Sequence, residues 1–433
     1  MAGRGPALVA LLVLGAALAA IIAWTTPWQP LPGPVPGGRT VAEPGRDFTA
    51  SEQERENDFH RAVRPPAYAS LALGVVVLGL LGLTPAGARV VDWSGRLLGG
   101  GWAARAALGA VALTVVVRVV TLPLDARAEV ALRRYGLSTQ SWGGWLVDQG
   151  KACAVAAVLL VVAALGFYAI ARAAPRTWWS WSALAGAALT VAVSFAYPLV
   201  VEPVFNRFTS MPAGELRTSL LELAARDGVA IDDVLVADAS RRTTALNAYV
   251  SGLGSTRRIV VFDTLVEKAT PEEVRLVVAH ELGHVVEHDV RDGTLVGALG
   301  VATSVALLFL ILGSAALLRR AGVGDATDPR GLALLLFLVT VLGTVSGPLH
   351  TLVSRRVEAR ADVHSLELTR DPETFVASER RLALTNLGDL DPHPVVYGLF
   401  FTHPSGPQRI ALARDFARRE GLPDPLPRAA TTP

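Results

Sequence analysis

The sequence predicts a mainly α-helical membrane protein whose chain crosses the bilayer seven times. Two properties of the composition lead to this fold class: the mean hydropathy is +0.41, and only 18% of the 433 residues are charged. A soluble chain of this length is normally more polar. The third observation is a series of apolar stretches of about twenty residues, the length with which an α-helix crosses roughly 30 Å of hydrocarbon.

Seven stretches have this length and composition. The first also has features of a secretory signal, because Arg4 precedes an Ala- and Leu-rich core, although its uncharged part is longer than the roughly 7–15 residues of a typical signal core. Arg118 lies inside the third, and a charge at that depth is expected to face protein or a water-filled cavity. The predicted spans are Pro6–Trp24, Ala67–Leu83, Trp102–Leu122, Ala152–Ile170, Trp179–Val200, Thr294–Leu318 and Leu332–Val353.

Two polar regions are too long to be turns between spans. The predicted organisation is a five-span membrane region at 1–201, a polar region at 202–293, two spans at 294–353, a second polar region at 354–421 and a disordered tail at 422–433. Because the two spans form one out-and-back excursion, both polar regions are expected on the same side of the membrane. Arginines in other loops on that side favour a cytoplasmic face of the plasma membrane. They are Arg39, Arg46, Arg55, Arg61, Arg64, Arg127, Arg133 and Arg134.

The first polar region is predicted to contain a small α+β unit. A helix that begins at Ser210 and Pro212 is expected to continue through Arg226, and a short strand is expected at Val234–Ala239. The β-rich runs Asn247–Ser251 and Arg258–Phe262 enclose a glycine turn, which predicts a hairpin. Thr270, followed by Pro271 and by Glu273, then forms a capping-box pattern that begins a helix extending through His284. The second polar region is predicted to be mostly helical.

This last helix carries the pattern His280-Glu281-Leu282-Gly283-His284. Histidines at positions i and i+4 project from one helical face and can bind one Zn²⁺ through neutral ring nitrogens. Glu281 points toward the open coordination position, where it can take a proton from a water that the metal activates. A solvent-facing charged turn is the alternative, but the apolar neighbours of the pattern indicate a buried helix. The pattern therefore predicts one zinc ion per chain.

A catalytic zinc ion usually has three protein ligands, so a third ligand is expected elsewhere. Glu358 is the candidate, and it shares a helical face with Asp362 one turn later. Glu358 can bind the metal while Asp362 accepts a hydrogen bond from the far nitrogen of a zinc-bound histidine. Taken alone, this segment is more typical of a solvated helix with charges at i and i+4.

These motifs resemble, in the same order, the landmarks of the integral-membrane CAAX prenyl endopeptidases and their bacterial relatives among the HExxH zinc peptidases. The resemblance covers essentially the whole chain. It implies seven transmembrane helices around an intramembrane chamber, with a small α+β zinc metallopeptidase domain formed by the loop between spans five and six and the C-terminal region. The other segments that carry it are Pro203–Phe208, Asn247–Tyr249, Arg258–Leu265, Ser354–Asp362 and His403–Pro404.

The resemblance also implies roles for individual residues. The zinc ligands would be His280, His284 and Glu358; Glu281 would be the general base, and Asp362 the partner of a liganding histidine. His403 would stabilise the oxyanion with support from Arg409. Asn247, Ala248 and Tyr249 would form the edge strand that pairs with an extended substrate, although Asn247 alone is typical of a plain hairpin. His288 is assigned to the helix surface, and no role is assigned to Asp289.

The predicted function is hydrolysis of peptide bonds in membrane-associated or extended peptides, with the lipid bilayer as the second partner. A formal charge of +2, without clustered basic and aromatic residues, excludes a nucleic-acid-binding class. Heat-shock-type quality-control membrane zinc proteases share the chemistry but usually have fewer spans. A protease that cleaves within the membrane would place the HExxH pattern inside a span, and charged residues around it argue against that. A non-catalytic transporter or scaffold would explain the spans but not the ligand set.

Overall fold

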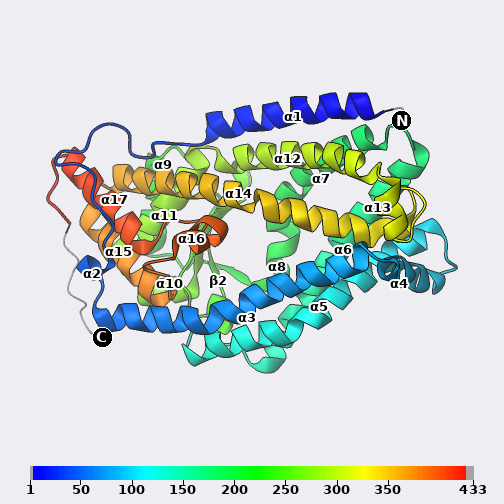
Figure 1. Ribbon diagram of the computed structural model, residues 1–433. Helices are drawn as coiled ribbons and strands as arrows, with labels where there is room; N and C mark the ends of the chain where they lie inside the picture. The colour runs from blue at the N-terminus through cyan, green and yellow to red at the C-terminus, as the bar shows by residue number, and fades with distance from the viewer. Residues whose placement is uncertain (1–2, 253, 426–433) are drawn as a thin grey trace.

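The computed structural model describes residues 3–252 and 254–425, so most of the expected tail at 422–433 lies outside the described residues. Long helices lie alongside one another through most of the molecule. The strands gather with α9, α10, α11, α15 and α17 at one end, and the N-terminus lies at the other end (Figure 1).

Seven helices in the described part of the chain are long and apolar enough to cross a membrane, which confirms the seven predicted spans. Several extend well beyond their apolar stretches, because polar residues with helical periodicity continue them at the end that holds the strands. The seven are α1 (Arg4–Thr25), α3 (Ala50–Gly82), α5 (Trp102–Arg134), α6 (Trp142–Ala173), α7 (Trp178–Ala196, continuing through a π-helical turn at Tyr197–Val201 into α8, Glu202–Phe205), α12 (Asp289–Leu312) and α14 (Leu332–Thr369).

The sixth predicted span, Thr294–Leu318, is wrong at its C-terminal end. Helix α12 ends at Leu312, and Ser314 caps a separate short helix, α13 (Ala315–Arg320), by accepting a hydrogen bond from the backbone N–H of Leu317. A side-chain cap of this kind favours a new helix start over continuation.

The remaining helices are short, and most of them lie at the end that holds the strands. They are α2 (Pro44–Asp47), α4 (Pro85–Arg96), α9 (Glu215–Arg226), α10 (Asp263–Lys268), α11 (Pro271–Val286), α15 (Pro372–Thr385), α16 (Pro394–Phe400) and α17 (Gly406–Arg419), with 3₁₀ turns at Ala239–Arg241, Gly254–Thr256 and Pro329–Gly331.

The strands β1 (Phe208–Ser210), β2 (Asp233–Ala237), β3 (Ala248–Ser251) and β4 (Arg258–Phe262) form one sheet in the order β1-β2-β4-β3. The predicted hairpin is confirmed, because β3 pairs antiparallel with β4. The predicted helix start at Ser210 is wrong, because Ser210 pairs with Leu235 in β1 and α9 begins only at Glu215. The sequence also did not predict the parallel pairing of β2 with β4. Strand β3 is at one edge, and its neighbour in the sheet is β4 alone.

Helix α11 lies beside the sheet and begins at the predicted capping box. The Thr270 hydroxyl accepts a hydrogen bond from the Glu273 N–H, and the Glu273 carboxylate accepts one from the Thr270 N–H. Val278 and Leu282 of α11 are buried in a core with Leu220, Val234 and Ile259. The apolar face of α11 is thus fixed against the sheet, and its histidines are left to face α14.

The arginine within the third predicted span has a protein partner, as expected. Arg118 forms an ion pair of 2.8 Å with Asp125, and the Ser70 hydroxyl donates to the same carboxylate at 2.6 Å. The charge of Arg118 is thereby compensated within the protein by a carboxylate of its own helix, α5.

Candidate active site

Two histidines of α11 and one glutamate of α14 converge on a common point. The Nε2 atoms of His280 and His284 are 3.3 Å apart. The Glu358 carboxylate lies 3.2 Å from His280 Nε2 through one oxygen and 3.7 Å from His284 Nε2 through the other. The structure therefore brings together the three residues that the sequence predicted as metal ligands.

These separations fit a single metal ion. Ligand atoms about 2.0–2.2 Å from a tetrahedral Zn²⁺ lie roughly 3.3 Å from one another. All three candidate ligand atoms lie within 4.8 Å of each other, and each comes from a side chain type that binds zinc. The donor set can hold the ion with little movement.

The far nitrogen of His280 is bound by a buried carboxylate. Asp362, whose side chain is 0% exposed, lies 2.9 Å from His280 Nδ1 through one oxygen and accepts a hydrogen bond of 2.9 Å from Arg409 Nε through the other. Arg409 also forms an ion pair of 2.7 Å with Glu379. Burial alone would lower the pKa of His280, but the hydrogen bonds to Asp362 and Glu358 outweigh burial and raise it to about 10 in the metal-free site.

His284 has an equivalent arrangement that the sequence did not predict. Its Nδ1 lies 2.8 Å from Asp289, which also binds Arg360, and Arg360 forms a 3.0 Å ion pair with Glu287. Asp289 can turn back toward the metal site because His288 adopts a left-handed conformation with φ of 61° between α11 and α12. His288 itself is exposed, as expected. An acidic residue at the start of the next helix was the available signal for Asp289.

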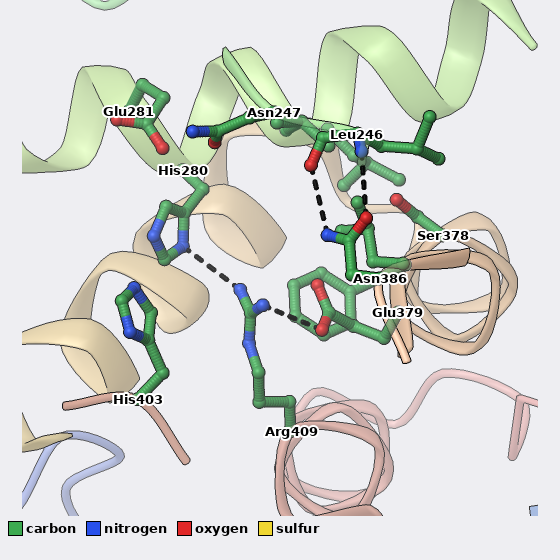
Figure 2. Close-up of a pocket in the computed structure, with 13 residues that line it drawn as sticks. Leu246, Asn247, His280, Glu281, Ser378, Glu379, Asn386, His403 and Arg409 are labelled. Atoms are coloured by element: carbon green, nitrogen blue, oxygen red, sulfur yellow. Dashed lines mark hydrogen bonds and ion pairs between the residues drawn. The ribbon is translucent and has the colours of Figure 1, made fainter. Parts of the chain in front are cut away.

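Glu281 lines a cavity of about 180 Å³ beside the ligands, together with His280, His403 and Arg409. Figure 2 shows Glu281 on the same side of this cavity as His280 and Asn247. Burial raises the pKa of Glu281, and the neighbouring histidines oppose this only in part. A carboxylate with a raised pKa is a better proton acceptor than an ordinary surface glutamate.

His403 approaches the same site from the loop before α17. Its Nε2 lies 3.1 Å from Glu358, and its side chain is 59% exposed. The predicted support of His403 by Arg409 is not seen, because among the described residues Arg409 forms its hydrogen bonds and ion pairs with Asp362, Glu379 and His280. Arg409 therefore orients the histidine and its carboxylate, while His403 faces the open side.

The predicted edge strand borders the cavity. Asn247 lines it directly, whereas Ala248 and Tyr249 form the first half of β3. The other wall contains apolar side chains of α11 and α15, including Val277, Phe375 and Leu382. The cavity thus extends from His280 to the residues that lead into β3.

Comparisons with known proteins agree with this arrangement. Residues 210–417 match the family described as Peptidase family M48, and residues 66–207 match the family described as CAAX prenyl protease N-terminal, five membrane helices. A Bacillus subtilis protein named "Uncharacterized metalloprotease YhfN" is 32% identical over 316 residues, covering 72% of this chain and 73% of that protein. The "CAAX prenyl protease 1 homolog" of Dictyostelium discoideum is 31% identical over 254 residues, 57% of this chain and 58% of the relative.

The crystal structure of S. mikatae Ste24p has the same fold. It superposes with a TM-score of 0.77 at 20% identity, covering 94% of this chain and 98% of that one. With the M48 match over the region that holds the site, and with seven helices able to span a bilayer, these findings establish the class of the protein. The chain belongs to peptidase family M48 and is a multi-pass membrane metalloprotease.

Proposed function

We propose that this metalloprotease is a zinc-dependent endopeptidase with one zinc ion per chain at His280, His284 and Glu358. The observation that carries this proposal is the convergence of the ligand atoms of these three side chains within 4.8 Å of one another, beside the half-buried Glu281. When bound, zinc would supply a Lewis acid for the attacking water and for the substrate carbonyl.

The side chains around the ligands have complementary tasks. Glu281 takes a proton from the attacking water and passes it to the leaving amine. His403 donates a hydrogen bond to the oxygen on which negative charge develops, a contribution of roughly 3 kcal/mol to the transition state where it is well aligned. Asp362 and Asp289 hold the rings of His280 and His284 in the tautomer that presents Nε2 to the metal.

The substrate would be an extended or membrane-associated peptide. Strand β3 is the sheet edge next to the cavity, so a peptide can add to it as a further strand and place one of its bonds over the ligands. Asn247, Ala248 and Tyr249 would contact it. The residues at 202–293 and 354–421 would together form the catalytic domain, on the cytoplasmic side of the plasma membrane.

The central experiment separates metal binding from chemistry. Glu281→Gln keeps the size of the side chain but removes the base, so purified protein should retain one zinc per chain while hydrolysis of a fluorogenic peptide falls by about 10²-fold or more. His280→Ala should instead lose zinc. A Glu281→Gln protein that cleaved at the wild-type rate would contradict the mechanism, and full zinc in His280→Ala would contradict the ligand assignment.

The His403→Ala variant tests the proposed oxyanion contact. It should retain zinc and the base but lose a donor to the transition state, so kcat should fall more than KM rises. Steady-state kinetics with the same peptide check this. A change confined to KM would instead place His403 among the residues that bind the ground-state substrate.

A further inference from the structure

Asn386, the residue that follows α15, hydrogen-bonds both backbone groups of Leu246. Its side-chain oxygen accepts from the Leu246 N–H at 2.8 Å, and its side-chain nitrogen donates to the Leu246 carbonyl at 3.0 Å (Figure 2). A residue of an adjacent strand forms the same pair of bonds with the residue opposite it. The amide of Asn386 therefore occupies the place of a neighbouring strand beside Leu246.

Leu246 lies two residues before the start of β3 at Ala248, and its contact with Asn386 lies in line with the free edge of that strand. The Phe262 N–H donates to the Asn247 carbonyl at 3.0 Å, so this carbonyl points toward β4. Strand geometry alternates from residue to residue, so Leu246, Ala248 and Val250 direct theirs to the opposite edge. Because β3 is the last strand of the sheet, this opposite edge is the one available to a peptide.

This contact lies inside the candidate active site. Leu246 and Asn386 both line the cavity that also contains His280, Glu281 and His403. The side chain of Asn386 is not needed to end α15, because its backbone N–H already donates to the Leu382 carbonyl at 2.9 Å. The side-chain amide is thus committed to the strand edge next to the candidate metal ligands.

We propose that Asn386 is a positioning residue that closes the free edge of β3 at Leu246 and so fixes the register of a bound peptide. This inference rests on the proposed function. With the backbone groups of Leu246 already paired, a peptide can pair only from Ala248 onward. Sliding by the two-residue period of a strand, roughly 6.8 Å, would otherwise bring a different peptide bond over the metal ligands.

The first test maps the bonds that are cut. Wild-type protein should cut a defined peptide at one principal bond, whereas zinc-loaded Asn386→Ala should give a second product cut two residues away. If Asn386→Ala cuts the wild-type bond alone, the proposal is overturned.

The second test measures binding without cleavage, in the Glu281→Gln background. A fluorescent peptide is lengthened by two residues at either end. With Asn386 present neither extension should improve the Kd, but with Asn386→Ala one of them should tighten binding roughly 3- to 10-fold by pairing with Leu246. Equal gains with and without Asn386 would overturn the proposal. Absence of hydrolysis by wild-type protein would instead contradict the proposed function and would leave this binding test intact.

The matched control is Gln53→Ala, which also removes a side-chain amide. The Gln53 amide donates a hydrogen bond of 2.9 Å to the backbone carbonyl of Phe48, away from the sheet. The control variant should leave both the cleavage site and peptide binding unchanged. Zinc content and thermal unfolding show whether each variant is folded. If Asn386→Ala is not folded, Asn386→Ser, which is also too short to reach both groups of Leu246, takes its place in both tests.

Discussion

At the scale of single residues, both candidate liganding histidines are held in the same way. His280 is bound to Asp362 and through it to Arg409, while His284 is bound to Asp289 and through it to Arg360. Each carboxylate is compensated by a guanidinium, so the buried negative charge is not left unpaired. Two independent supports leave the rings little freedom to turn away from Glu358.

The support of His284 gives the first prediction. Asp289→Asn removes the charge that holds the ring, so zinc affinity should fall roughly 10- to 100-fold, as it should for Asp362→Asn. Competition with a chromophoric chelator measures the affinity. Asp292→Asn is the control, because Asp292 lies one turn further along α12 and pairs with Arg291 at 2.8 Å. Unchanged zinc affinity in Asp289→Asn would show that this contact does not orient the ligand.

Glu379 gives a prediction for the pH dependence of stability. Burial raises its pKa from 4.5 to about 7, and Arg409 opposes this only in part. Between those values the folded protein binds a proton that the unfolded chain has released, so this group makes folding less favourable as the pH rises. The Tm of metal-free wild-type protein should therefore fall relative to that of Glu379→Gln between pH 5 and 8. A difference in Tm that stays constant over this pH range would contradict a raised pKa of the buried Glu379 carboxyl.

The residues that could be predicted are those fixed by local spacing. The i, i+4 geometry of one helix placed His280 and His284 together, whereas Glu358 needed a long-range contact and was only a candidate until the family resemblance was added. Asp289 gave only a weaker signal, its place at the start of the next helix, and Asn386 gave none. One depends on the left-handed turn at His288, and the other on the packing of α15 beside the strand.

At the scale of elements, the site depends on how closely α11 and α14 approach. Gly283 faces His364 across this contact, and a Cβ atom at Gly283 would lie 3.1 Å from the His364 Cβ. His364 cannot easily move away, because its Nε2 is 2.9 Å from Asp227. The glycine thus allows the histidines of one helix to reach the glutamate of the other.

Gly283→Ala should therefore separate the two helices slightly and weaken the metal site. We expect a loss of stability of roughly 1–3 kcal/mol, typical of overpacking, together with lower zinc affinity, and a larger effect for Gly283→Val. Thermal unfolding and zinc competition measure both quantities. Gly293→Ala in α12 is the control, because a Cβ there would meet no atom within 4 Å apart from its chain neighbours and the backbone of its own helix. Wild-type zinc affinity in Gly283→Val would show that the helix spacing is not critical.

The predicted elements are those with strong local patterns, including the spans, the hairpin and the capping box of α11. The parallel pairing of β2 with β4 was not predictable, because β3 lies between them in sequence and their contact depends on the tertiary packing of α9 and α11. The end of α12 at Leu312 was missed for a different reason. An apolar run continues past it, and only the cap formed by Ser314 separates the two helices.

At the scale of the whole molecule, the out-and-back path of α12 and α14 joins two distant parts of the sequence into one site. Helix α11 precedes this pair and α15 follows it, and both pack at the end where the strands gather (Figure 1). One shared metal site requires residues 202–293 and 354–421 to lie in the same compartment.

This path does not say which side of the membrane the two regions share, and the charges of the loops are a weak guide to it. Arginines also lie at the opposite ends of the helices, near α4 and α13 (Figure 1). They include Arg89, Arg96, Arg176, Arg319 and Arg320. Because arginines border the membrane at both ends, their bias toward a cytoplasmic catalytic side is small. A direct measurement of sidedness is therefore the decisive one.

Single cysteines in the full chain provide that measurement, after the one native cysteine is replaced by Cys153→Ala. Three exposed positions are suitable. Glu222→Cys reports on α9 in the first polar region, and Asp391→Cys reports on the segment after α15 in the second. Gly324→Cys reports on the connection between α13 and α14. In intact cells a membrane-impermeant thiol reagent should label only Gly324→Cys, and permeabilisation should expose the other two together. Labelling of all but Gly324→Cys in intact cells would reverse the orientation and keep the shared site. Opposite sidedness of Glu222→Cys and Asp391→Cys would instead be incompatible with His280, His284 and Glu358 binding one ion, because no chain path could then bring them to the same point.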